Sequence, residues 1–211
     1  MMPNARQVRE FAASPAAFRD ALTIRAADGP RLFSEVMADF QRRDFAAFDP
    51  SFVALRDGTK PPITRFWCER TKGASKDSDI ALMILWLLCF SQRSLTIQVG
   101  AADQSQADEL RLAAKETASL NGWLGGQISF QRNAIVCDRS GNRADILPFD
   151  IAGSHGARPD LCIINEIHAH PNREFADNLM DNAEKVPHGI VMVLTNAGHD
   201  PSWQFDLREI A

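Results

Sequence analysis

The chain has 211 residues, of which 45% are hydrophobic and 24% charged, and its formal net charge is −4. This balance is typical of a globular domain with a substantial core and excludes a disordered chain. Because the net charge is acidic, any contact with DNA has to use a local patch or several subunits together. The longest apolar run, residues 80–90, is too short for a membrane span of ~20 residues, and the N-terminus lacks the apolar core of a signal peptide. We therefore expect a soluble intracellular protein.

Residues 1–50 carry apolar side chains at helical spacing, which predicts an N-terminal segment of two or three amphipathic helices. The expected breaks are the turn-forming stretches Ser14-Pro15, Asp28-Gly29-Pro30 and Asp49-Pro50. Beyond this segment, short apolar runs alternate with helical stretches. The expected helices are 77–90 and 104–120, and the expected strands are 63–68, 94–99, 127–130, 134–137, 145–149, 161–164 and 190–194.

Strands and helices that alternate over ~130 residues predict an α/β fold with a mostly parallel central sheet flanked by helices. The continuous apolar runs at 161–164 and 190–194 suit strands buried on both faces of that sheet. The turn-like stretch 139–142 predicts some antiparallel pairing as well. The four cysteines form no CxxC pair, so we expect buried free thiols at Cys68, Cys89, Cys137 and Cys162.

The stretch 65–79 predicts a strand, a loop of small residues and lysines, and the start of a helix. Backbone N–H groups at a helix start can surround phosphate oxygens, and a lysine at Lys76 can reach the outer phosphates. The match to GxxxxGK[ST] is poor, because Ser75 replaces the second glycine and Asp77 replaces the hydroxyl residue that binds magnesium. The alternative is an ordinary strand–helix connection with a polar N-cap, Asp77 or Ser78. The predicted phosphate-binding residues are Gly73, Ala74, Ser75, Lys76, Asp77 and Ser78.

The apolar run at 161–164 ends in Asn165-Glu166. In P-loop ATPases such a strand end presents an acidic pair, whose first member holds magnesium through water and whose second activates the attacking water. Glu166 fits the second role, although a solvated loop residue is the alternative. Asn165 replaces the usual aspartate and removes a formal charge from the magnesium shell. The last strand ends in Thr195 and Asn196, which are candidates for sensing the γ-phosphate.

The order of these elements is similar to that in the ATPase domain of the phage terminase large subunit, over roughly residues 35–200. Glu166-Ile167-His168 resembles the family's Asp-Glu-x-His element, and residues 195–198 resemble its Thr/Ser-x-Ala/Pro-Gly element. Gln41 falls where the family keeps an adenine-contacting glutamine. The elements are, in chain order, the Lys76 loop, residues 100–107, residues 149–156, Asn165-Glu166 and residues 195–198.

The resemblance implies a P-loop NTPase of the additional-strand, RecA- and helicase-like class, with a core over residues 51–211 behind the helical segment 1–50. It implies ATP and Mg²⁺ as cofactors and Lys76 and Glu166 as catalytic residues. Arg70 becomes a candidate arginine acting on the γ-phosphate in cis, with surface ion pairing as the alternative.

Magnesium would be held through water by Asn165 and Asp77, although neither is the usual residue. Asp77 can supply the charge that Asn165 lacks, with Ser75 or Ser78 supplying the hydroxyl. An added carboxylate beside a triphosphate repels it unless a metal ion lies between them.

By the same resemblance, the chain would drive double-stranded DNA into a procapsid in the host cytoplasm, away from membranes. Its partners would be DNA, further copies in a ring, the portal and the small terminase subunit. The family continues into a nuclease domain, which we do not expect here, since the chain ends at Ala211; an isolated ATPase fragment and a truncated gene are both consistent. Two other functions stay open: a helicase-type ATPase, which would need a second RecA-like domain, and a degenerate, non-hydrolysing interaction module, which Asp77 and Asn165 favour.

Overall fold

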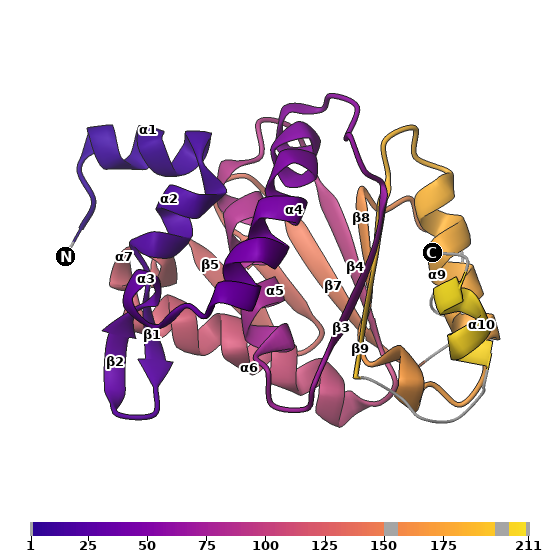
Figure 1. Ribbon diagram of the computed structural model, residues 1–211. Coiled ribbons are helices and arrows are strands. Elements are labelled where there is room, and N and C mark those ends of the chain that lie inside the picture. The colour runs from indigo at the N-terminus through magenta and orange to yellow at the C-terminus, as the bar shows by residue number, and fades with distance from the viewer. Residues whose placement is uncertain (1, 150–155, 197–202, 210–211) are drawn as a thin grey trace.

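The computed structural model describes residues 2–149, 156–196 and 203–209. Its centre is a seven-stranded sheet with helices on both faces, an α/β arrangement as the sequence predicts (Figure 1). The strand order is β3-β9-β8-β4-β7-β6-β5. The strands are β3 (Arg65–Arg70), β4 (Thr96–Ala101), β5 (Ile128–Gln131), β6 (Ala134–Cys137), β7 (Arg143–Pro148), β8 (Leu161–Ile164) and β9 (Ile190–Asn196).

Five neighbouring strands, from β3 to β7 in that order, are parallel, whereas β5 and β6 pair antiparallel at the far edge. The predicted antiparallel turn at 139–142 therefore joins β6 to β7. β9 lies between β3 and β8, although it comes last of the three in the sequence. This order brings the carboxyl ends of β3, β9 and β8 to one edge of the sheet.

The main core lies between one face of the sheet and helices α5 (Lys76–Phe90) and α6 (Gln104–Leu120). Every side chain of α5 from Ile80 to Cys89 is buried, because this part of the helix is apolar on all sides and packs within the core. A smaller cluster fills the other face beneath α9 (Glu174–Glu184) and α10 (Trp203–Glu209). Among the described residues after β3, the remaining short elements are α7 (Gly122–Gly125) and the 3-10 turn η1 (Ile167–Ala169).

The N-terminal segment differs from the expected run of helices. It contains α1 (Ala5–Ala13), α2 (Pro15–Asp20), α3 (Phe33–Val36) and α4 (Asp39–Asp57), but residues between α2 and α3 form a hairpin of β1 (Thr23–Ala26) and β2 (Gly29–Leu32). Gly29 adopts a φ of +121°, which favours glycine and turns the chain at the predicted Asp28-Gly29-Pro30 break.

The predicted break at Pro50 is wrong, because α4 continues through it to Asp57. A proline inside a helix removes one backbone hydrogen bond. The apolar face of α4 compensates for this loss, since Phe45, Phe48 and Phe52 are all buried in the main core. The expected boundary between a helical segment, residues 1–50, and a core, residues 51–211, falls inside this helix and stays a prediction.

The other sequence expectations concern burial. The four cysteines are free and buried, as predicted. Over the described stretches of the chain, no helix is both long and apolar enough to cross a membrane.

Candidate active site

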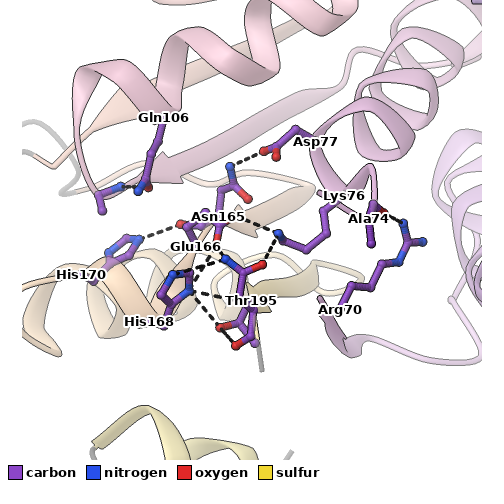
Figure 2. Close-up of polar contacts among 12 residues, drawn as sticks. Arg70, Ala74, Lys76, Asp77, Gln106, Asn165, Glu166, His168, His170 and Thr195 are labelled. Atoms are coloured by element: carbon purple, nitrogen blue, oxygen red, sulfur yellow. Dashed lines mark hydrogen bonds and ion pairs between the residues drawn. The ribbon is translucent and has the colours of Figure 1, made fainter. Parts of the chain in front are cut away.

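Three segments that are far apart in the sequence meet at the carboxyl edge of the sheet. They are the loop between β3 and α5, the residues that follow β8, and the end of β9 (Figure 2). In open α/β sheets, ligands bind in the crevice outside the carboxyl ends of parallel strands. Most of the predicted element at 149–156, together with Ala197 and Gly198, lies outside the described residues.

The loop after β3 contains two residues with positive φ. Gly73 has a φ of +79°, and Ser75, immediately before the helix, has a φ of +58°. A non-glycine residue in the left-handed region costs roughly 1–2 kcal/mol, so the surrounding contacts hold this loop in shape. Ser75 occupies the N-cap position of α5 and makes no side-chain cap hydrogen bond in the described structure. Ser75, and not Asp77 or Ser78, is therefore the N-cap residue, and a helix start without a side-chain cap from this residue suits an anion.

Lys76, the first residue of α5, contacts both other segments of the site. Its side chain is buried, with Nζ 2.8 Å from Glu166 Oε1 and donating to Asn196 Oδ1 at 2.7 Å. Figure 2 shows Lys76 pointing toward Glu166 from the helix start. The predicted lysine, glutamate and sensor residue are thus in mutual contact, and an incoming phosphate would compete with Glu166 for the lysine.

Glu166 is held from three sides. Besides its ion pair with Lys76, its Oε2 accepts a hydrogen bond from Asn196 Nδ2 at 3.1 Å and lies 3.1 Å from His168 Nδ1. The backbone of Glu166 is left-handed, with a φ of +50°. Such a conformation in a non-glycine residue costs energy and clusters at functional sites. Its side chain is 13% exposed, and this partial burial and these contacts argue against the alternative of a freely solvated loop residue.

His168 received no role from the sequence beyond its place in the Glu-x-His element. In the structure it connects the glutamate to the last strand, because its Nδ1 also lies 3.3 Å from Thr195 Oγ1. The only signal in the sequence was the spacing of Glu166 and His168, which the single turn of η1 brings to one side. Of the two predicted sensors, Thr195 therefore reaches the predicted catalytic glutamate through His168, and Asn196 contacts it directly.

Asp77 and Asn165 form a second contact across the site. Asn165 Nδ2 donates to Asp77 Oδ1 at 2.6 Å, and Asn165 is 1% exposed. Burial raises the pKa of the Asp77 carboxyl, and the nearby charge of Glu166 adds to that rise, whereas Asn165 and Lys76 oppose it. Asn165 Oδ1 is buried and has no hydrogen-bond partner among the described residues. The predicted magnesium residues thus lie together, with one carboxylate and one uncommitted oxygen.

Arg70, the last residue of β3, is ion-paired, but in a buried position and not at the surface. Its Nη1 donates to Asp79 Oδ2 at 2.6 Å and to the carbonyl of Ala74 at 3.0 Å, and its Nε donates to Asp44 Oδ2 at 2.9 Å. A contact with a γ-phosphate would require these bonds to break. The catalytic role of Arg70 stays a prediction, and its observed contacts hold the loop against α4 and α5.

Gln41 is also committed to protein contacts. Its Nε2 donates to both carboxylate oxygens of Asp79, at 2.8 and 3.0 Å, and its Oε1 accepts from the Ala38 backbone at 2.9 Å. It nevertheless lines a cavity of ≈310 Å³ with Ser75 and Ser78, at the start of α5. That volume lies at the lower end of small-molecule sites.

His170 is buried next to the backbone of Asn165, and we expect it to make the stability of the fold depend on pH. Burial lowers its pKa, against the opposing hydrogen bond that its Nε2 donates to the Asn165 carbonyl at 2.9 Å. A histidine with a depressed folded pKa stabilises the fold fully above its unfolded pKa of ~6.5, and that stability is lost as pH falls. We expect the unfolding free energy, measured by urea denaturation, to fall between pH ~7.5 and ~5.5 by more in the wild type than in His170→Gln. An equal fall in both chains would contradict this assignment.

Comparisons with known proteins place the fold. No protein-family model and no curated protein matches the chain. Among solved structures, the large terminase of bacteriophage HK97 superposes with a TM-score of 0.66 at 16% identity, covering 87% of this chain and 37% of its own. The large terminase ATPase domain of Thermus phage P74-26 gives 0.52 at 14% identity, covering 73% of this chain and 71% of its own.

A third structure agrees with these two. The large terminase of another thermophilic bacteriophage gives a TM-score of 0.53 at 10% identity, covering 69% of this chain and 37% of its own. The chain therefore has the fold of phage large terminase ATPase domains. It spans just over a third of the HK97 protein and of this third protein, and at these identities the likeness concerns the fold.

Proposed function

We propose that this chain is the ATP-binding and ATP-hydrolysing motor domain of a viral terminase large subunit, which drives double-stranded DNA into a procapsid. The observation that carries the proposal is the contact between Lys76, Glu166 and Asn196, three residues from three separate segments at the sheet edge. A buried lysine beside a glutamate at an uncapped helix start suits a phosphate that has to be both bound and attacked. The fold of phage large terminase ATPase domains supports the same function.

Nucleotide binding is assigned to the loop and the helix start. The backbone of the loop from Gly73 to Ser78, with Ala74, Ser75 and Asp77 between them, would surround the phosphates, and Lys76 would exchange Glu166 for a phosphate oxygen. The base would enter the cavity lined by Gln41. Mg²⁺, bound with the nucleotide, would neutralise charge on the phosphates.

Catalysis is assigned to Glu166 as the general base, in reach of a water beside the lysine-bound phosphate. His168 and Asn196 would position its carboxylate, since both contact Oε2. Because Asn196 also binds Lys76, loss of the γ-phosphate would change the contacts of Asn196 at the end of β9. We assign Thr195 and Asn196 to this sensing role, and Arg70 to holding the loop, with action on the γ-phosphate as its further predicted role.

The wider assembly follows from the proposed function. Double-stranded DNA, further copies of the chain in a ring, the portal and the small terminase subunit are the proposed partners, on the procapsid in the host cytoplasm. A non-hydrolysing interaction module is the second candidate, and one observation favours it. Lys76 and Glu166 neutralise each other in this structure, and both predicted magnesium residues depart from the usual pattern.

Phosphate release from ATP separates these two candidates. The motor predicts turnover that rises when linear double-stranded DNA is added to the chain, because translocation couples the two. Lys76→Ala is the matched inactive control, and Lys185→Ala, at an exposed lysine just after α9, should behave as wild type. Saturable ATP binding with no phosphate release, with or without DNA, would reject the motor and favour the interaction module.

A further inference from the structure

The two residues predicted to hold magnesium are an acid on a helix, Asp77, and an amide at a strand end, Asn165. Asp77 follows Lys76 at the start of α5, and Asn165 follows the last residue of β8. Their side chains share a hydrogen bond of 2.6 Å, so the two positions act on the same small volume. Figure 2 shows the Asn165 side chain facing Asp77, with a dashed line marking their hydrogen bond.

The oxygen of Asn165 is the independent sign of a ligand at this place. Asn165 is 1% exposed, and its amide nitrogen donates a hydrogen bond to Asp77. Its Oδ1 has no hydrogen-bond partner among the described residues. A buried oxygen without a partner carries an uncompensated desolvation cost, so a buried orphan of this kind calls for a missing hydrogen-bond donor or a cation. Carboxylate and amide oxygens are ligands suited to Mg²⁺. The residues present therefore fit the metal.

We infer that the carboxylate and the neutral donor of the magnesium site have exchanged places in this chain. Asp77 on α5 is the anionic ligand, in the position where a hydroxyl residue is usual, and Asn165 at the end of β8 is the neutral oxygen donor. This inference rests on the proposed function, since the metal arrives with a nucleotide. The site is complete in charge and is not a decayed one.

Charge in the site supports the exchange. Lys76 brings one positive charge, and Asp77 and Glu166 bring one negative charge each. The usual pattern, with a hydroxyl residue after the lysine and an aspartate before the glutamate, carries the same net charge. Loss of the aspartate alone would have left the lysine and glutamate balanced, with nothing to attract a divalent cation. Asp77 restores that charge within hydrogen-bond distance of the original position.

The test compares the affinity for ADP with Mg²⁺ and with EDTA, by titration calorimetry, in the wild type, Asp77→Thr, Asn165→Asp and the double variant. We expect Mg²⁺ to strengthen ADP binding in the wild type. Asp77→Thr should lower the affinity for ADP in the presence of Mg²⁺ by about 10- to 100-fold and so remove that gain. Asn165→Asp, which keeps Asp77, should retain it. The double variant should regain it, because it carries the carboxylate on the strand end.

The matched control is Asp39→Thr, the same substitution at an exposed aspartate in the first turn of α4, which should leave the Mg²⁺ gain unchanged. If Asp77→Thr does not fold by circular dichroism, Asp77→Asn removes the charge and keeps the shape. An Mg²⁺ gain that survives in Asp77→Thr or Asp77→Asn overturns the inference. So does a double variant no better than Asp77→Thr.

A titration with Mn²⁺ alone, followed by electron paramagnetic resonance, separates this inference from the proposed function. Mn²⁺ binding that depends on Asp77, in a chain that binds no ADP, would support the exchanged pair and reject the nucleotide site. ADP binding that Mg²⁺ strengthens equally with and without Asp77 would support the nucleotide site and reject the exchanged pair. A chain that binds neither ADP nor Mn²⁺ would overturn both.

Discussion

Glu166→Gln is expected to lower ATP turnover by about 10²- to 10⁴-fold, the usual contribution of a positioned general base. The substitution keeps the size of the side chain and an oxygen that can accept from Asn196. Binding of ATP should not weaken, and it should become tighter, because Lys76 no longer has a carboxylate partner that competes with phosphate. Steady-state phosphate release and titration calorimetry on the same preparation measure the two effects separately.

The control for this substitution is Glu174→Gln, an exposed glutamate in the first turn of α9. It should change neither turnover nor affinity. Wild-type turnover in Glu166→Gln would show that Glu166 is not the base. Loss of turnover together with loss of ATP binding would show that the residue acts on the structure of the site and not on the reacting water.

Asp79→Ala is expected to lower the unfolding free energy by about 3–5 kcal/mol, the range for removing one partner of a buried ion pair. Asp79 is 2% exposed and accepts hydrogen bonds from Arg70 and from Gln41. Without it, Gln41 Nε2 loses its acceptor and Arg70 keeps only Asp44 as an acidic partner among the described residues. Urea denaturation followed by circular dichroism measures the change.

Asp177→Ala is the matched control for Asp79→Ala. Asp177 pairs with Arg173 one turn away at the start of α9, and the two side chains are 41% and 49% exposed. Exposed pairs of this kind contribute about 0–1 kcal/mol. A destabilisation of Asp79→Ala no larger than that of Asp177→Ala would mean that the network around Arg70 does not hold the loop against the helices.

The sequence predicts most of the sheet correctly, and the reason lies in its continuous apolar runs. The bounds of β6 and β8 agree with expectation, as do those of α6, whose N-cap Asp103 accepts a hydrogen bond from Gln106. The β1–β2 hairpin is not predicted, because its two strands are four residues long each, contain no buried residue and so carry no alternating pattern. Its Asp28-Gly29 turn is a hairpin signal, although the helical spacing on either side of it predicts only a break between helices.

The candidate site, too, could be predicted from the sequence only in part. Parallel strands meet at their carboxyl ends, so the proximity of Lys76, Glu166 and Asn196 could be predicted from the order of the strands. The partners of each side chain could not, because they depend on how helices pack over the sheet. Arg70, expected at a phosphate or at the surface, contacts Asp79 and Asp44 from two helices that the sequence does not place against it.

Titration calorimetry of ATP and of ADP, with and without Mg²⁺, on the wild type and on Lys76→Ala shows whether the Lys76 loop binds nucleotide. We expect saturable binding in the wild type that is lost in the variant, because Lys76 is the buried cation at the helix start. Circular dichroism of the variant checks that it is folded. Absence of binding in the wild type at millimolar nucleotide would contradict the claim and leave the fold alone standing.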